Sequence, residues 1–421
     1  MKFDTIIIGG GLAGLTCGIR LQKAGQKCAI VSAGQSAMHF FSGSFDLLCR
    51  LPDGTEVSNP VEDMDKLPEY HPYSVLGKEK VRKYAMEAPD FLMSCGIRTS
   101  GDCIRNTWRI TPTGERKPSW LTVSDFTALD SKDEKIAEKA LIVNISGYLD
   151  FNTSFLAESF ESHGTRCRVE SLKLEEMERL RNNPSEMRAT NIARVMDRDE
   201  IWIKAAGFVR DMIKDEDLVV LPAVFGLKNA EITDRIREVT GVRTIFIATM
   251  PPSVPGIRSQ MTLKAEFEKA GGRFLPGDTV IDAIRDEYGR ISSICTYNLG
   301  EIRLHADNFV LASGSFFSKG LCALPDGIYE PIFGIDLNCS DDRAEWFDRS
   351  FWKRQNYISF GAITDNHLNA SKEGKMIDNL YVIGSNLGGS NTLHEGCGGG
   401  IALITALAAA DEIIGKMEER R

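Results

Sequence analysis

The sequence predicts an α/β protein in which a Rossmann-like nucleotide-binding domain carries an inserted α/β cap or substrate domain. Three observations predict it. The first 32 residues have a strand–turn–helix–strand pattern, residues 140–249 alternate apolar runs with amphipathic segments, and a strand near the C-terminus leads into a glycine-rich helix start. Strand and helix signals that alternate in this way are typical of domains built on a parallel sheet.

The N-terminal segment contains the most specific motif. A β-branched run at residues 3–8 ends in G-x-G-x-x-G, a helical pattern follows as far as Gly25, and a second apolar strand covers residues 28–31. In this motif the first glycine permits the tight turn, the second lets a pyrophosphate approach the backbone, and the third lets helix and strand pack closely. We therefore expect a nucleotide-type cofactor at Gly9, Gly11, Leu12, Ala13 and Gly14, with Ser32 at the end of the second strand as a further contact. The acidic residue that usually binds the adenosine ribose is absent, because Ser32 stands at the end of the second strand.

The rest of the chain, which has 421 residues in all, divides by composition and pattern. A helix is expected at about 77–95, and buried strands at 141–145, 218–221 and 244–247 belong to the cap. A strand at 308–315 and another at 379–385 return to the nucleotide-binding domain. The predicted units are therefore 1–50, 256–320 and 371–421 for the nucleotide-binding domain, 51–255 for the cap or substrate domain, and 321–370 for a further cap or connecting segment.

The two later strands end in small residues that suit contact with a bound cofactor. The second leads through the glycines at 396–400 into a helix that begins at Ile401. Because the N-terminus of a helix attracts negative charge, this start is a second place for a cofactor. The residues expected to contact it are Ser313, Gly314, Gly384, Ser385, Gly398, Gly399, Gly400 and Ile401.

Composition excludes several classes of function. With 59 acidic and 50 basic residues the formal charge is −9, so we expect no nucleic-acid partner. Ten cysteines form no C-x-x-C pair, which predicts buried reduced thiols and no iron–sulfur or zinc site in this chain. The apolar stretches at 5–19 and 401–410 are too short for a membrane span, and we expect neither a signal peptide nor a transmembrane segment.

Three segments, 6–32, 308–315 and 380–402, together resemble the flavoprotein fold shared by fumarate reductases, glucose-inhibited-division-type proteins and glycerol-3-phosphate dehydrogenases. The resemblance implies that the cofactor is a flavin. It also implies that the last glycine-rich helix start points at the pyrimidine edge of the flavin ring. The residue after the glycine of the final strand is commonly Asp in these proteins and is Ser385 here.

Five further segments, 35–48, 180–183, 191–194, 251–258 and 396–400, resemble the signature of the B subunits of anaerobic glycerol-3-phosphate dehydrogenases. This resemblance implies oxidation of sn-glycerol 3-phosphate to dihydroxyacetone phosphate, with electrons passing to menaquinone. It implies a catalytic A subunit and a membrane-bound iron–sulfur C subunit as partners. The expected location is therefore the cytoplasmic side of the inner membrane, peripheral through those partners.

Several side chains are candidates for contact with cofactor or substrate. Ser42, Gly43 and Ser44 form a small-residue loop suited to lie beside a planar ring. His39 and His394 are candidate proton carriers, because imidazole titrates near neutral pH. Arg258 is a candidate ligand for the substrate phosphate. The alternatives are that His39 is a packing residue and that Arg258 forms a structural ion pair.

The sequence leaves cofactor identity and role open. The resemblance and the missing ribose carboxylate favour FMN, and the dinucleotide motif keeps FAD as the alternative. Either this chain oxidises the substrate or it relays electrons. The rival interpretations are a non-catalytic assembly subunit and a fumarate-reductase-like or ketosteroid-dehydrogenase-like enzyme with another substrate.

Overall fold

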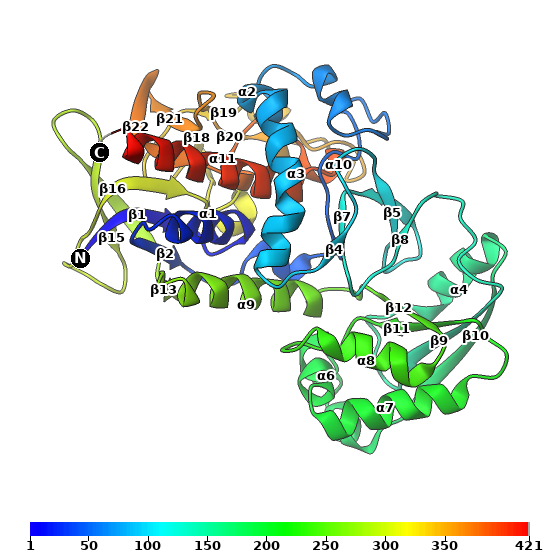
Figure 1. Ribbon diagram of the computed structural model, residues 1–421. Helices are drawn as coiled ribbons and strands as arrows, with labels where there is room; N and C mark the ends of the chain where they lie inside the picture. Colours follow the sequence, from blue (N-terminus) through cyan, green and yellow to red (C-terminus); the bar gives the residue numbers. More distant parts are fainter. Residues whose placement is uncertain (420–421) are drawn as a thin grey trace.

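The computed structural model describes residues 1–419 and contains two α/β parts, each built on its own sheet (Figure 1). The larger sheet has the strand order β13-β2-β1-β16-β15-β14, with β22 paired to β16 and β21 paired to β22. Strands β13, β2, β1, β16 and β22 are parallel, and β14, β15 and β21 join antiparallel. The bounds are β1 Lys2–Ile8, β2 Cys28–Ser32, β13 Arg273–Pro276, β14 Val280–Arg285, β15 Ile291–Thr296, β16 Leu304–Leu311, β21 Asn369–Lys372 and β22 Lys375–Val382.

Helices cover this sheet because its central strands are apolar on both faces. Ile6 and Ile7 of β1 are completely buried, as expected for a strand inside a parallel sheet. Helix α1 packs beside α9 and α11, and α3 crosses α11 (Figure 1). Their bounds are α1 Leu12–Lys23, α3 Lys78–Ser94, α9 Val254–Lys269 and α11 Gly398–Glu418.

Helix α11 has the length and hydropathy of a membrane span, the one such helix among residues 1–419. Its most apolar window is 67% buried inside the protein, against α1 and α3. Burial of this kind explains its composition, because a helix that is apolar on all sides suits the core of a large domain.

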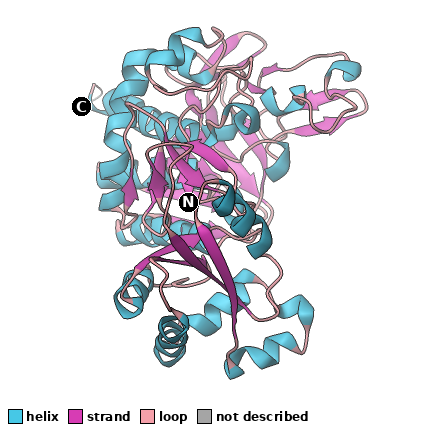
Figure 2. Cartoon of the chain, turned by 90° about the vertical axis from the view of Figure 1, so that its right-hand side faces the viewer, coloured by secondary structure: helices cyan, strands magenta, loops and turns pink. Residues whose placement is uncertain are grey.

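The second part is a four-stranded parallel sheet in the order β10-β9-β11-β12, which lies with its helices at the lower end of the molecule (Figures 1 and 2). The alternation of apolar runs and amphipathic segments predicted this arrangement. The strands are β9 Lys139–Ile145, β10 Arg166–Leu172, β11 Leu218–Pro222 and β12 Arg243–Ile247, and the helices are α4 Thr153–Ser162, α5 Glu178–Arg181, α6 Ala189–Met196, α7 Asp199–Met212 and α8 Glu231–Thr240.

Short elements complete the fold. They form two three-stranded sheets, β3-β7-β4 and β6-β5-β8, and two two-stranded sheets, β17-β18 and β19-β20. The bounds are α2 Pro72–Leu76, β3 Ser44–Phe45, β4 Thr99–Ser100, β5 Thr107–Ile110, β6 Arg116–Ser119, β7 Leu121–Val123, β8 Ala128–Leu129, β17 Cys322–Leu324, β18 Gly327–Tyr329, β19 Leu337–Asn338, β20 Gly361–Ala362 and α10 Thr392–Glu395.

The stretch 51–255 that was expected to form the cap is therefore shared between the two parts. Helix α3 was predicted at 77–95 and is found at Lys78–Ser94, but it packs on α11 of the nucleotide-binding domain. The cap sheet itself begins only at Lys139. Sequence composition could not show this, because α3 and the cap helices are amphipathic in the same way.

Candidate functional site

The turn between β1 and α1 has the close contacts that the glycine motif predicts. Gly9 has φ +121°, and a Cβ at this residue would lie 2.0 Å from the carbonyl oxygen of Ala312 at the end of β16. A Cβ at Gly14 would lie 1.9 Å from the carbonyl oxygen of Gly9. Only glycine fits at either position, so both hold helix, turn and sheet together.

Gly11 differs, because the space beside it is open. Its nearest neighbour for an added Cβ is the Cβ of Ser36 at 3.6 Å. Gly11 is also the N-cap of α1, where no side chain caps the helix and no acidic residue occupies the first turn. Backbone N–H groups at such a helix start are free to bind phosphate oxygens. The chain therefore has the cradle that a flavin nucleotide requires, with Leu12 half-buried and Ala13 buried at its base.

A pocket of about 290 Å³ lies at the carboxyl end of β2, where dinucleotide folds bind the adenosine. Ser32, Gly34, Gln35 and Lys264 line it, and Phe274 closes one side. The Ser32 hydroxyl donates to the carbonyl of Gly34 at 3.3 Å. None of the residues that line the pocket is acidic, so the pocket offers no carboxylate to a ribose. The pocket thus exists although the usual acidic residue does not.

His39 also lines this pocket, at the carboxyl end of β2. Burial lowers the pKa of His39, and the side chain of Gln260 partly opposes that shift. Its carbonyl accepts a hydrogen bond from the N–H of Ser253 at the start of α9. The contacts of His39 are thus with the β2 end of the site.

The residues that directly follow β16 and β22 meet on the other side of the turn between β1 and α1. The amide of Asn386 joins them, since its Oδ1 accepts from the N–H of Gly314 at 2.7 Å and its Nδ2 donates to the hydroxyl of Ser313 at 3.1 Å. A Cβ at Gly384 would lie 2.9 Å from the Cβ of Ala13, and Ser385 is exposed. The structure thus places these four predicted residues close to the glycine turn.

The glycines at the start of α11 have two different roles. A Cβ at Gly399 would lie 2.9 Å from the Cα of Phe45, and one at Gly400 would lie 2.4 Å from the hydroxyl of Tyr73. These two glycines therefore let neighbouring segments of the protein pack directly against the helix. Ile401 is buried in the core. Gly398 has nothing closer than 3.5 Å, so its outer side is free to face a cofactor.

The loop Ser42–Ser44 packs against β7 and the segment that follows it. Gly43 has φ +105°, and a Cβ there would touch the ring of Phe126 at 2.6 Å. Ser44 is buried, whereas Ser42 is partly exposed. Of the three, Ser42 has the side chain accessible to a ligand.

Arg258 makes the contacts of a structural ion pair, which is one of the two roles considered for it. Its buried guanidinium forms an ion pair with Asp125, and its Nη1 donates to the carbonyl of Gly226 at 2.6 Å. These contacts join α9 to the cap. Contact of Arg258 with the substrate phosphate stays a prediction.

His394 lies next to the start of α11. Its backbone N–H caps α10 by donating to Oδ1 of Asn391 at 3.1 Å. Its Nε2 is buried and has no hydrogen-bond partner among residues 1–419. A buried nitrogen without a partner is unusual, and His394 therefore remains a proposed site residue.

The sequence did not reveal a buried pair beside this helix. His71 and Glu395 are completely buried, with Nε2 of His71 3.2 Å from Oε2 of Glu395. The Nδ1 of His71 accepts from the N–H of Tyr73 at 3.1 Å, so the proton is on Nε2 and is donated to the carboxylate. Cys397 lies nearby, but both ring nitrogens of His71 are already used, which argues against a metal at this group.

A second unforeseen cluster joins Ser44, Asp46 and Arg109. The Nε of Arg109 donates to the hydroxyl of Ser44 at 2.6 Å, and that hydroxyl is 2.5 Å from Oδ1 of Asp46. Arg109 is 65 residues from Ser44 in the chain, so no local pattern could have found the contact.

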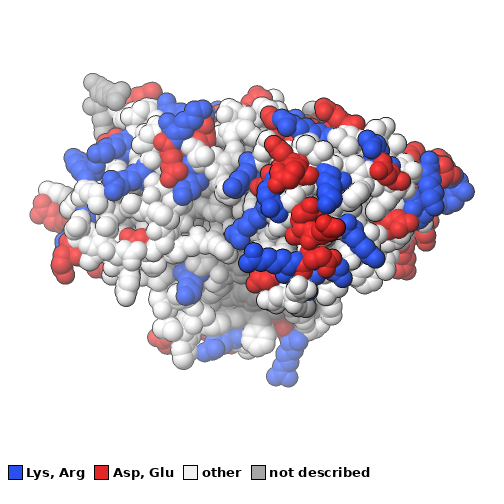
Figure 3. All heavy atoms as spheres, turned by 90° about the horizontal axis from the view of Figure 1, so that it is seen from below, with Lys and Arg blue, Asp and Glu red and all other residues white. Residues whose placement is uncertain are grey.

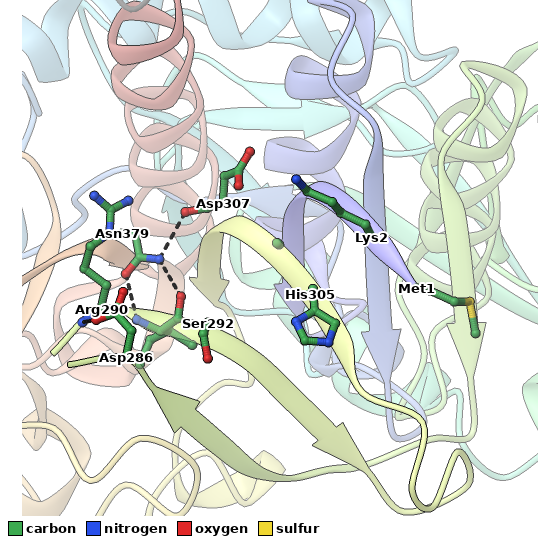
Figure 4. A pocket seen from close by; sticks show the side chains of 10 residues that line it. Met1, Lys2, Asp286, Arg290, Ser292, His305, Asp307 and Asn379 are labelled. Carbon is green, nitrogen blue, oxygen red and sulfur yellow. Dashed lines mark hydrogen bonds between the residues drawn. The ribbon is translucent and has the colours of Figure 1, made fainter. Parts of the chain in front are cut away.

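A larger hollow of about 550 Å³ lies at the amino ends of β1 and β16 (Figure 4). Lys2, His305, Asp307 and Asp286 line it. The amide of Asn379 is occupied by the backbones of Ile291 and Asp307, as Figure 4 shows. Ligands of open α/β sheets bind at the carboxyl ends of the strands, so this hollow is not the nucleotide site.

Comparison with known proteins agrees with this arrangement. A family model described as FAD binding domain matches residues 4–401. A protein of Yersinia enterocolitica, named as the B subunit of an anaerobic glycerol-3-phosphate dehydrogenase, is 41% identical over 99% of both chains. The protein of that name from Pectobacterium atrosepticum is 39% identical over 98% of this chain and 99% of its own.

The chain belongs to this family of B subunits. As a member of an FAD-binding flavoprotein family, it binds a flavin. The resemblance to flavoproteins and to these B subunits that the sequence indicated is confirmed. The family model gives no support to FMN over FAD.

Two solved structures are similar over the whole chain. The 3-ketosteroid Δ1-dehydrogenase of Sterolibacterium denitrificans is 11% identical with a TM-score of 0.47, covering 99% of this chain and 100% of its own. The quinol fumarate reductase of E. coli is 9% identical with a TM-score of 0.43, covering 100% of this chain and 71% of its own.

Proposed function

We propose that this chain is the flavin-bearing subunit of a dehydrogenase that oxidises sn-glycerol 3-phosphate to dihydroxyacetone phosphate and passes the electrons to menaquinone through partner subunits. The observation that carries the proposal is the open space at Gly11 and the free helix start of α1, in a chain whose relatives bear this enzyme's name over nearly their whole length. The flavin supplies the acceptor for the two electrons removed from the alcohol.

The cofactor we propose is FAD. The preference for FMN depended on the missing carboxylate at Ser32 and on the family resemblance. The pocket of about 290 Å³ at that place offers room for the adenosine, and the matching family model is for FAD. The Lys264 ammonium lines this pocket and lies 4.7 Å from the centre of the Phe274 ring.

We further propose that the chain acts in a complex and reaches the membrane through its partners. An exposed aromatic surface formed by Phe347, Phe351 and Trp352 is a suitable place for one of them, since Phe351 and Trp352 are 81% and 91% exposed. The chain that follows this aromatic surface is joined to the segment before α11, because Nδ2 of Asn391 donates to the carbonyl of Gln355 at 3.1 Å. Exposed apolar patches of this kind are typical of docking surfaces. In contrast, the face seen from below has acidic and basic side chains intermixed (Figure 3).

Two measurements on the purified chain test the proposal. Mass spectrometry of the extracted cofactor should give the mass of FAD, and an FMN mass would overturn that assignment. Under anaerobic conditions, glycerol 3-phosphate should bleach the bound flavin, whereas quinone reduction should require the added partner subunits. A flavin that the substrate does not reduce, with or without the partners, would exclude the dehydrogenase. Rapid quinone reduction by the chain alone would exclude the need for a complex.

A further inference from the structure

Asp46 directly follows β3, and its backbone packs against the start of α11. The N–H of Gly400 donates to the carbonyl of Asp46 at 2.9 Å, and a Cβ at Gly399 would lie 3.0 Å from the N of Asp46. The side chain of Asp46 is 21% exposed, although its neighbours Phe45 and Leu47 are buried. The Asp46 carboxylate is therefore partly exposed, in a segment whose backbone packs on Gly399 and Gly400 of the helix start.

The hydrogen bonds around this carboxylate have a fixed direction. A guanidinium has N–H donors and no acceptor, so the Nε–H of Arg109 donates to the hydroxyl oxygen of Ser44, 2.6 Å away. The hydroxyl proton of Ser44 is then left for Oδ1 of Asp46 at 2.5 Å. Oδ1 is thus occupied as an acceptor by a chain of two hydrogen bonds that begins at a buried guanidinium.

The other oxygen, Oδ2, accepts no hydrogen bond from any residue that the structure describes. The Nη2 of Arg109 is 3.8 Å from it, which is an ion pair beyond hydrogen-bonding distance. A carboxylate with one oxygen held and the other free is oriented to receive a proton at a single atom. General bases are typically held in this way by a neighbouring group.

We propose that Asp46 is the general base of this enzyme, accepting at Oδ2 the proton of the substrate's secondary hydroxyl, and that Arg109 acts through Ser44 as a positioning residue. This inference rests on the proposed function. The O–H bond breaks and its proton goes to Asp46. The C–H bond of the same carbon breaks, its two electrons and hydrogen leave as hydride to the oxidised flavin, and a C=O bond forms.

The charges that face Asp46 are consistent with this role. Burial raises the pKa of Asp46, and Arg109, the bond from Ser44 and Lys117 on β6 partly oppose that rise. The thiols of Cys49 and Cys397 lie nearby, and burial raises the pKa of both, so they stay neutral. A carboxylate whose pKa is raised has a higher affinity for the proton that it accepts, which favours its action as a base.

The first test is Asp46→Asn in the holoprotein. Flavin content should be unchanged, and the rate of flavin bleaching by glycerol 3-phosphate should fall by about 10²–10⁴-fold, the usual contribution of a general base. Asp211→Asn, at an exposed acidic residue of the cap, is the matched control and should leave the rate unaltered. If the rate of Asp46→Asn equals that of the wild type, Asp46 is not the base.

The second test uses pH. Because the base must be ionised, the rate should be lost as pH falls through the pKa of Asp46. Arg109→Gln removes the positive charge that lowers this pKa, so its rate should be lost at a higher pH than in the wild type. Ser44→Ala should also raise the pH at which the rate is lost, because it removes a hydrogen bond to the ionised carboxylate. If the rate is lost at the wild-type pH in both variants, the positioning role is overturned.

The third test does not depend on turnover. The absorbance of the bound flavin, titrated with acid, should show a transition in the wild type and in Asp211→Asn that is missing in Asp46→Asn, because a carboxylate beside the ring perturbs its spectrum when it ionises. The same transition in Asp46→Asn would place Asp46 away from the flavin.

If the wild-type flavin is not reduced by substrate, the proposed function fails, and with it the assignment of a base. An active wild type whose Asp46→Asn variant is equally active overturns only this inference.

Discussion

Gly14→Ala and Gly11→Ala add the same methyl group to the same turn, but the structure predicts different consequences for them. The new Cβ at residue 14 would lie 1.9 Å from the carbonyl oxygen of Gly9, against about 3.5 Å for an ordinary contact. Helix α1 would have to move by more than 1 Å, and over-packing of this kind costs about 1–3 kcal/mol. Since the methyl group meets a backbone oxygen, which cannot rotate away as a side chain could, we expect the upper end of that range for Gly14→Ala.

The Cβ at residue 11 would meet only Ser36, at 3.6 Å, and φ there is −86°, which any residue adopts. The free energy of unfolding of the cofactor-free protein should therefore change by about 1 kcal/mol or less. Flavin binding should nevertheless be lost, because the methyl group occupies the place of a phosphate, and Gly11→Val should lose it completely. Urea unfolding of the cofactor-free proteins and the flavin content of the purified variants measure the two effects. Full flavin occupancy in Gly11→Val, or equal destabilisation by both alanines, would refute the reasoning.

Two other predictions concern the surroundings of α11. Glu395→Ala should lower the free energy of unfolding by about 3–5 kcal/mol, because it leaves the buried N–H groups of His71 and Asn391 without an acceptor, and Glu395→Gln should cost less. Urea unfolding measures this, and a loss under about 1 kcal/mol for the alanine variant would contradict it. The double variant Phe351→Asp and Trp352→Asp should keep its flavin and its stability but bind the partner subunits more weakly in a pull-down or titration. Unchanged partner binding would place the docking surface elsewhere.

The sequence alone determined the features that depend on neighbouring residues. The strand, the glycine turn and the helix of residues 2–23 could be predicted because hydrophobic period and glycine conformation are local properties. The same holds for α3 and for the alternating strands and helices of the cap. Gly9 and Gly14 were assigned correctly for the close approaches that they permit.

Only the tertiary structure decided the partners of individual side chains. Arg258 is a positively charged residue in any reading of the sequence, but its ion pair with Asp125 spans 133 positions. His71 and Glu395 are 324 positions apart, and Arg109 reaches Ser44 from a different sheet. Composition and spacing contain no information about such contacts, because a side chain's partner and burial depend on how distant strands and helices come together.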